Sequence, residues 1–192
     1  MEERARRIVA TAIELAEKGG FEAVRLRDVA AHSGVALGTL YRHFRSKEEL
    51  LLGALADQIA QLERLLESMP TLGPTPLQRI TTLFAMATRA MCLRPMLARA
   101  IIKAAASGTP EPALKVASFH GSILAMVVAA MRDSHKPVSD PSKDEADVAE
   151  LLEFVWFSSL VGWAAGLHDE DYVNDRVRTA ATLMLAALEK AD

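Results

Sequence analysis

The sequence predicts an all-α protein of about nine helices. Three observations support this fold class. Apolar residues recur at helical spacing along most of the chain, hydrophobic residues make up 51% of it although aromatic residues make up only 5%, and glycine and proline fall between the periodic runs. Ala, Leu, Val and Met must therefore fill the core, and these residues suit helices better than sheets.

The first expected helix covers residues 4–18. Ile8, Ala12 and Ala16 form one apolar stripe, whereas the charged residues lie elsewhere on the helix. The pair Gly19–Gly20 follows and is expected to end the helix. Phe21 then enters a small core shared with the next two helical runs.

These two short runs flank a glycine turn. The first contains Val29 and stops at Ser33–Gly34, where glycine can adopt the left-handed conformation that ends a helix. The second begins near residue 36 and directs Leu40 and Phe44 towards the interior. Two helices joined in this way form the helix-turn-helix pattern, whose second helix fits a DNA major groove.

The outward face of the second run favours DNA over a purely structural corner. Gly38 removes a side chain where a phosphate could approach closely. The hydroxyls of Thr39 and Tyr41 suit phosphate oxygens, and Arg42 and His43 add donors. The structural alternative stays open, because small helical domains commonly contain such corners. For Tyr41 it is a half-buried packing residue.

The remaining helices are marked by their capping residues and prolines. Ser46 is expected to cap a helix that runs to about Ser68, with Glu49 as its capping-box partner. Prolines and Gly73 then break the chain. Further helices are expected over about 75–92, 95–106, 111–133, 144–167 and 171–189, the last two with aspartates at their starts.

Several functional classes are disfavoured. The five histidines show no metal-ligand spacing, Cys92 is alone, and we find no phosphate-binding glycine loop or nucleophile elbow. We therefore expect no enzyme activity, metal or cofactor. The start of the chain is charged and no apolar run reaches the length of a membrane span. We expect a cytoplasmic protein without a membrane partner.

Charge is distributed unevenly. The net charge is −3, but by count residues 1–50 contain nine Lys or Arg and eight Asp or Glu, so this segment is about +1 and the remainder about −4. Basic residues cluster around the glycine turn, and such a patch promotes counterion release from DNA. The cluster comprises Arg25, Arg27, Arg42, Arg45 and Lys47.

The C-terminal helices predict a second protein surface. Leu151 to Leu167 is apolar nearly all the way round, and one helix of a monomer this size rarely buries every face. We therefore expect a two-helix dimer face that forms a four-helix bundle with its copy. Its expected residues are Trp156, Leu160, Trp163, Val177, Ala180, Ala181, Met184 and Leu188.

Apolar residues of the larger domain could also line a ligand cavity, although close packing of a core explains each of them as well. Three methionines would make such a cavity adaptable. The candidates are Leu83, Phe84, Ala87, Met91, Met96, Ile101, Phe119, Ile123, Met126, Val127, Phe154 and Phe157. Arg89, Arg94, Arg99 and Lys103 could bind phosphates of a ligand, or could form a solvated helix face.

The TetR family of bacterial one-component transcriptional regulators has a DNA-binding signature that closely resembles GVALGTLYRHFRSKEEL, and the preceding stretch of the family resembles EKGGFEAVRLRDVAAHSGV. The resemblance runs from about Arg4 to about Leu55. KstR-like repressors of steroid catabolism are similar in two further segments, TPLQRITTLFAMATRAMCLRPMLARAI and FVWFSSLVGW.

This resemblance implies a helix-turn-helix DNA-binding domain over residues 1–48 and a helical effector-binding and dimerisation domain over 49–192. It implies a homodimeric repressor that binds a palindromic double-stranded DNA operator. Phosphate or sugar contacts fall on Thr39, Tyr41, His43 and Lys47, base-edge contacts on Leu37, Gly38 and Arg42, and a contact from the preceding helix on Arg27.

The implied effector is a bulky hydrophobic molecule, with a sterol- or lipid-derived acyl-CoA as one candidate. Two alternatives remain open. One is a repressor of a multidrug efflux system that responds to lipophilic drugs, and the other is a helical lipid-binding protein that does not bind DNA.

Overall fold

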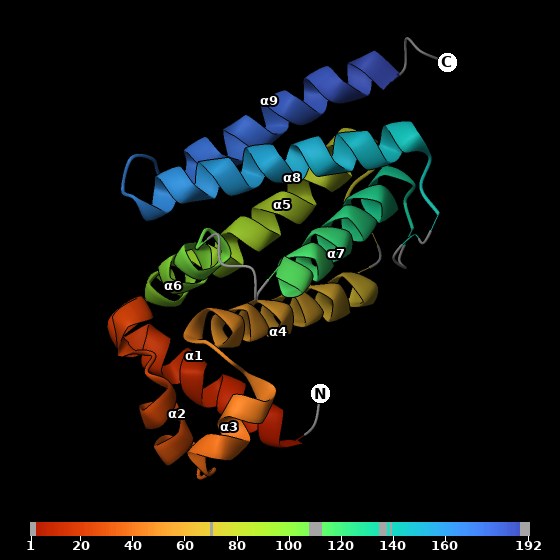
Figure 1. Cartoon of the computed structure of the whole chain (residues 1–192). Coiled ribbons are helices and arrows are strands. Elements are labelled where there is room, and N and C mark those ends of the chain that lie inside the picture. The colour runs from red at the N-terminus through yellow and green to blue at the C-terminus, as the bar shows by residue number, and fades with distance from the viewer. Residues whose placement is uncertain (1–2, 70, 108–112, 135–137, 139, 189–192) are drawn as a thin grey trace. The chain divides into compact units, whose positions relative to one another are not determined.

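Nine helices and no strands are found in the part of the chain that the computed structural model describes, residues 3–69, 71–107, 113–134, 138 and 140–188 (Figure 1). This confirms the all-α fold class. The helices are α1 (Glu3–Ala23), α2 (Leu26–His32), α3 (Leu37–His43), α4 (Lys47–Ser68), α5 (Pro76–Cys92), α6 (Pro95–Ala105), α7 (Ala113–Met131), α8 (Lys143–Ala164) and α9 (Glu170–Leu188).

Contacts between residues divide the chain into two compact units. The N-terminal unit contains Met1–Ile59 and Leu93–Phe119, and the C-terminal unit contains Ala60–Cys92 and His120–Asp192. Helices α4 and α7 each contribute to both units. This grouping by contacts differs from the expected division after residue 48. That division separates a DNA-binding domain from an effector-binding domain by function, and it stays a prediction.

In the N-terminal unit, α1 packs against α6, α2 and α3. Its apolar stripe is buried as expected, including Ile8, Ala12 and Ala16. Gly19 and Gly20 both have non-helical backbone angles, so the first helical run ends at this pair as expected, and a short second run continues to Ala23 within α1. Gly20 has φ 64° and ψ −157°, a conformation that glycine adopts readily, so the pair forms the kink between the two runs.

The end of α2 and the start of α4 follow from capping chemistry. Gly34 has φ 67°, and the hydroxyl of Ser33 donates to the carbonyl of Val29 at 2.7 Å. At the start of α4, the amide of Glu49 donates to Ser46 Oγ at 3.1 Å. The Glu49 carboxylate accepts the amide of Arg45 at 2.6 Å, one residue before the cap residue of the usual capping box.

In the C-terminal unit, α9 packs against both α5 and α8, and α8 and α9 lie side by side in Figure 1. The Phe84 and Trp156 rings meet in the core, with centroids 5.6 Å apart. Trp156 Nε1 donates to Thr88 Oγ1 at 2.9 Å, and Thr88 in turn donates to the carbonyl of Phe84 at 2.7 Å. The buried indole and hydroxyl therefore both have hydrogen-bond partners.

The caps of α8 and α9 lie slightly earlier than the sequence indicated. Ser142 caps α8 in a full capping box with Glu145, whereas Asp144 lies inside the first turn. At α9, Asp169 Oδ1 accepts the amide of Tyr172 at 2.9 Å, so this aspartate precedes the expected first residue, Asp171.

We expect the stability of the C-terminal unit to fall in acid through Glu145. Its side-chain bond with Arg132 lowers the pKa of Glu145 from 4.5 to about 2. Because the folded-state pKa lies below the unfolded value, this contribution is complete above about pH 4.5 and is lost as the pH falls towards 2. Urea midpoints measured across this range should show a smaller decline for Glu145→Gln than for the wild type. Parallel declines would contradict the prediction.

Candidate nucleic-acid interface and ligand pocket

The turn between α2 and α3 is held by backbone bonds. The amide of Gly34 donates to Ala31 at 3.3 Å, and the amide of Val35 donates to Ala30 at 3.0 Å. Leu40 is fully buried and fixes the inner side of α3. A Cβ atom built on Gly38 would meet nothing within 4 Å, so packing within the chain does not require glycine there. The opposite side of α3 is therefore open.

All eight predicted DNA contacts lie in the N-terminal unit, on α2, α3 and the first turn of α4. Tyr41 is 48% exposed, so about half of its surface is accessible to a partner. Arg42 Nη2 donates to Thr39 Oγ1 at 3.1 Å, so these two polar groups support each other on α3. Arg27, Gly38 and Arg42 are also exposed, and Leu37, Thr39, His43 and Lys47 are half-buried.

Lys47 has intramolecular partners that sequence analysis missed. Its Nζ lies 3.5 Å from Glu22 Oε2 and 3.7 Å from the centroid of the Phe21 ring. Lys103 of α6 approaches the same carboxylate at 2.9 Å. The hydrogen bond and charge of Lys103, together with the charge of Lys47, lower the pKa of Glu22. No sequence motif joins these residues, because they come from three separate helices.

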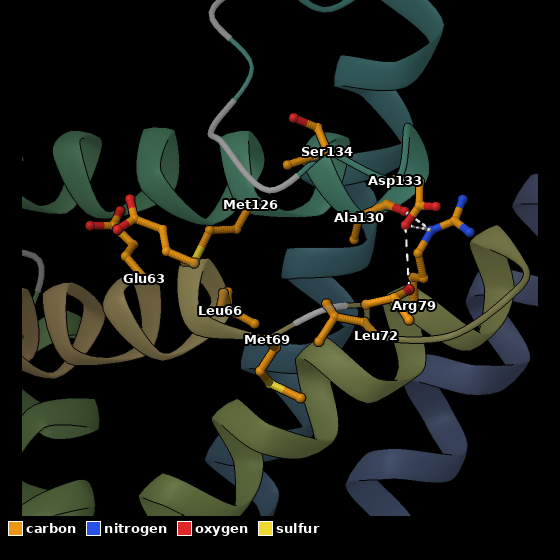
Figure 2. Close-up of a pocket in the computed structure, with 12 residues that line it drawn as sticks. Glu63, Leu66, Met69, Leu72, Arg79, Met126, Ala130, Asp133 and Ser134 are labelled. Atoms are coloured by element: carbon orange, nitrogen blue, oxygen red, sulfur yellow. Dashed lines mark hydrogen bonds and ion pairs between the residues drawn. The ribbon is translucent and has the colours of Figure 1, made fainter.

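A cavity of about 50 Å³ opens in the C-terminal unit (Figure 2). Its apolar wall is formed by Leu66, Met69, Leu72, Met126, Ala129 and Ala130. Carboxylates of Glu63, Glu67 and Asp133 also line it. Figure 2 shows Glu63 and Asp133 towards opposite ends of this group. A cavity this size can hold a few waters or one small group, whereas drug-sized ligands need several hundred Å³.

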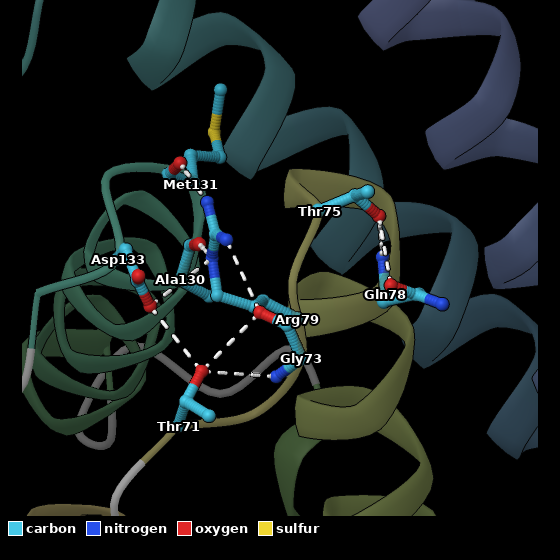
Figure 3. Close-up of polar contacts among 8 residues, drawn as sticks. All are labelled: Thr71, Gly73, Thr75, Gln78, Arg79, Ala130, Met131 and Asp133. Atoms are coloured by element: carbon cyan, nitrogen blue, oxygen red, sulfur yellow. Dashed lines mark hydrogen bonds and ion pairs between the residues drawn. The ribbon is translucent and has the colours of Figure 1, made fainter.

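Arg79 is the one cation among the described residues that line this cavity, and its guanidinium is engaged by protein groups (Figure 3). Nε donates to the carbonyl of Ala130 at 2.6 Å, and Nη2 donates to that of Met131 at 2.9 Å. Nη1 donates to Gly73 at 3.2 Å, and Asp133 Oδ1 lies 3.6 Å from Nε. Arg79 thus satisfies carbonyls that the end of α7 leaves unpaired. It is a structural anchor that sequence analysis missed.

The twelve residues expected to line a ligand cavity do not gather around this one. Only Met126 is shared. Phe154 and Met96 are 50% and 39% exposed, and Met91 and Phe157 are half-buried. Met96, Ile101 and Phe119 belong to the N-terminal unit. The eight buried members are Leu83, Phe84, Ala87, Ile101, Phe119, Ile123, Met126 and Val127, as close packing of a core alone would require.

Three of the four basic residues considered for ligand phosphates take part in ion pairs. Arg89 lies 3.7 Å from Glu170, Arg94 lies 3.2 Å from Glu17, and Lys103 pairs with Glu22. These contacts favour a solvated, paired helix face over a phosphate site.

The exposed apolar face of the last two helices differs from the expected dimer face. Half of the expected residues are buried within the single chain: Trp156, Leu160, Val177 and Ala181. The other four, Trp163, Ala180, Met184 and Leu188, are half-buried. On α8, the exposed apolar residues are instead Leu151, Phe154 and Val161, and on α9 Leu183 is 68% exposed. The α8 residues recur at helical spacing, so they share one stripe.

Neither a membrane-crossing helix nor a metal-ligand cluster is found among the described residues. None of their helices is long and apolar enough to cross a bilayer. No group of three or more His, Cys, Asp or Glu side chains within them could hold a metal ion.

Comparisons with known proteins match nearly the whole chain. Residues 8–54 match the family described as bacterial regulatory proteins, tetR family, and residues 73–184 match the tetracyclin repressor-like C-terminal domain. The HTH-type transcriptional repressor KstR of Rhodococcus jostii (strain RHA1) is 34% identical over 183 residues, which cover 95% of this chain and 83% of that protein. KstR of Mycobacterium tuberculosis is 31% identical over 189 residues, covering 98% and 84%.

Solved structures share the fold. A TetR transcriptional regulator from Rhodococcus sp. RHA1 superposes with a TM-score of 0.85 at 25% identity, covering 95% of both chains. Thermus thermophilus FadR in complex with lauroyl-CoA gives a TM-score of 0.72 at 19% identity, covering 94% of this chain and 93% of that one.

Proposed function

Because this chain belongs to the TetR family of bacterial regulatory proteins, we propose that it is a transcriptional repressor that binds a palindromic DNA operator as a homodimer. A bulky hydrophobic effector releases it from the operator. The repressor role is supported by its relatives in Rhodococcus jostii and Mycobacterium tuberculosis, which are named transcriptional repressors.

One observation carries the DNA-binding proposal. Helix α3 is anchored by buried Leu40, and its other side presents an open Gly38, an exposed Tyr41 and an exposed Arg42. A short helix with a buried inner face and hydroxyl and guanidinium groups outside has the chemistry of a recognition helix. Because one such helix reads few base pairs, two copies related by a two-fold axis are needed for a specific site.

Salt dependence of duplex binding tests this proposal. Affinity should fall linearly on a log–log plot of binding constant against salt concentration, with a slope of roughly −0.9 for each neutralised phosphate. Fluorescence anisotropy with a labelled duplex measures this slope. A chain without affinity for any duplex at low salt would contradict this proposal and favour the second alternative, a helical lipid-binding protein.

We expect the dimer to depend on the exposed apolar residues of α8 and α9. Replacing Phe154 and Leu183 with glutamate would bury unpaired charges at a two-fold contact, so we expect the dissociation constant to rise by at least about a hundredfold. Sedimentation equilibrium measures it. Leu65→Glu is the matched control, because Leu65 is 50% exposed on α4. A double variant that remains as dimeric as this control would contradict the proposed interface.

Two effector classes remain, and different observations support them. FadR proteins of the same fold were solved with lauroyl-CoA and stearoyl-CoA. In this chain, however, the described cavity is lined by Glu63, Glu67 and Asp133 and its one arginine is engaged, so it suits CoA phosphates poorly. Those carboxylates would pair with a small cationic group that fits about 50 Å³, such as the charged end of a lipophilic cation recognised by an efflux regulator. Release of a bound duplex by lauroyl-CoA or by a lipophilic cation distinguishes the two. The loss of DNA affinity cannot exceed the difference between the effector's affinities for the DNA-free and the DNA-bound protein.

A further inference from the structure

The bend in α1 brings one carboxylate close to two other helices of the N-terminal unit. Gly20 takes a left-handed φ of 64°, and a Cβ atom there would lie 3.2 Å from the methyl group of Met96 on α6. The chain therefore turns in close contact with α6. After this turn, Phe21 and Glu22 lie between the start of α4 and the side of α6, where Lys47 and Lys103 reach them.

The two lysines share the same partners. Lys103 Nζ lies 2.9 Å from Glu22 Oε1 and Lys47 Nζ lies 3.5 Å from Oε2. Both ammonium groups also lie over the Phe21 ring, at 4.4 Å and 3.7 Å from its centroid. Phe21 thus holds both cations beside one carboxylate through cation–π attraction.

The two contacts are unequal. The Lys103 contact is a normal charged hydrogen bond, whereas the Lys47 contact is at the outer limit of hydrogen-bond distance. A single carboxylate shared in this way binds each cation less strongly than it would bind one alone. Without Lys103, Glu22 would therefore pair with Lys47 alone and would bind it more strongly.

We propose that Glu22 is a positioning residue for DNA binding, which holds Lys47 back from a DNA phosphate, and that Lys103 of α6 weakens this hold. The inference rests on the proposed function, because it takes Lys47 as a phosphate contact. A phosphate and Glu22 compete for one ammonium group. Any movement of α6 that separates Lys103 from Glu22 then lowers DNA affinity without any change in the recognition helix.

A second carboxylate on α1 provides matched controls. Glu17 pairs at 3.2 Å with Arg94, the residue before α6, whereas Lys47 pairs with Glu22. Glu17→Gln therefore removes the same charge as Glu22→Gln. Arg94→Ala likewise removes one cation and one link between α1 and α6, as Lys103→Ala does.

The test measures binding of the full-length dimer to a duplex that the wild type selects from a random-sequence library. Relative to Glu17→Gln, we expect Glu22→Gln to tighten binding about two- to fivefold, since exposed ion pairs contribute at this level. Relative to Arg94→Ala, Lys103→Ala should weaken it by a similar factor. Both differences should vanish in a Lys47→Ala background, because no ammonium group then remains to be withheld.

Three results would overturn the inference. The first is equal affinities of Glu22→Gln and Glu17→Gln, and the second is a difference that persists without Lys47. The third result is a wild-type chain that binds no duplex, which overturns the proposed function as well. Circular dichroism and sedimentation serve to check that each variant remains a folded dimer. If the wild type binds and only the variant differences are absent, the inference alone fails.

Discussion

Replacing Tyr41 and Lys47 together with alanine is expected to weaken binding to the selected duplex by about a hundredfold. Each side chain is proposed to contact a phosphate, and a hydrogen bond to a charged group contributes about 1.5–3 kcal/mol, so two such bonds account for a factor of this size or larger. Fluorescence anisotropy at fixed salt measures the loss. The salt slope should become shallower by about one unit, since one cation is removed.

The matched control is Lys143→Ala, which removes an exposed cation at the start of α8. It should leave duplex affinity within about twofold of the wild type, because Lys143 belongs to the C-terminal unit and is not among the proposed DNA contacts. Sedimentation should show that the Tyr41 and Lys47 variant remains a dimer. Unchanged duplex affinity in that variant would remove α3 and the start of α4 from the proposed interface.

Replacing Arg79 with methionine is expected to lower the free energy of unfolding by about 3 kcal/mol. Arg79 is 7% exposed and donates to the carbonyls of Gly73, Ala130 and Met131. Methionine fills similar space but leaves one buried and two part-buried acceptors unpaired, at about 1–3 kcal/mol for a buried group before water or backbone movement compensates. Urea unfolding followed by circular dichroism measures the change.

Arg89→Met is the control on the same helix. The Arg89 side chain is 65% exposed and its ion pair with Glu170 is 3.7 Å long, so we expect a change below about 0.5 kcal/mol. Equal stability of the two variants would show that the Arg79 contacts do not hold the loop and the end of α7 together.

Local signals in the sequence were sufficient to predict the helices. Gly34, Ser46, Pro76 and Pro95 mark helix boundaries because each has a backbone or capping property that acts within a few residues. Gly19–Gly20 likewise ends the first helical run of α1, because both glycines have non-helical backbone angles at the kink.

The faces of α8 could not be assigned from periodicity. When a helix is apolar nearly all the way round, every face is a possible interface, and the choice depends on which neighbours pack against it. Trp156 was expected at the dimer face, but Thr88 and Phe84 of α5 hold it in the core. Phe154, expected in a cavity, is half exposed for the same reason.

Local sequence patterns could not predict the cavity or the contacts of Glu22 with Lys47 and Lys103 either. Both combine residues distant in sequence, as in Arg79 with Ala130 or Glu22 with Lys103. The predicted DNA contacts differ in this respect, because a helix-turn-helix places its outward residues within one short segment. Their positions on α2, α3 and α4 could therefore be predicted, whereas their contacts with DNA remain a proposal.

Selection of duplexes from a random-sequence library by the full-length chain tests the central claim most directly. If paired α3 helices read DNA, the enriched duplexes should contain a palindrome whose half-sites lie about one helical turn apart. Sedimentation of the complex should show chains bound in multiples of two. Enrichment of no sequence, or of an asymmetric site bound by one chain, would contradict the account.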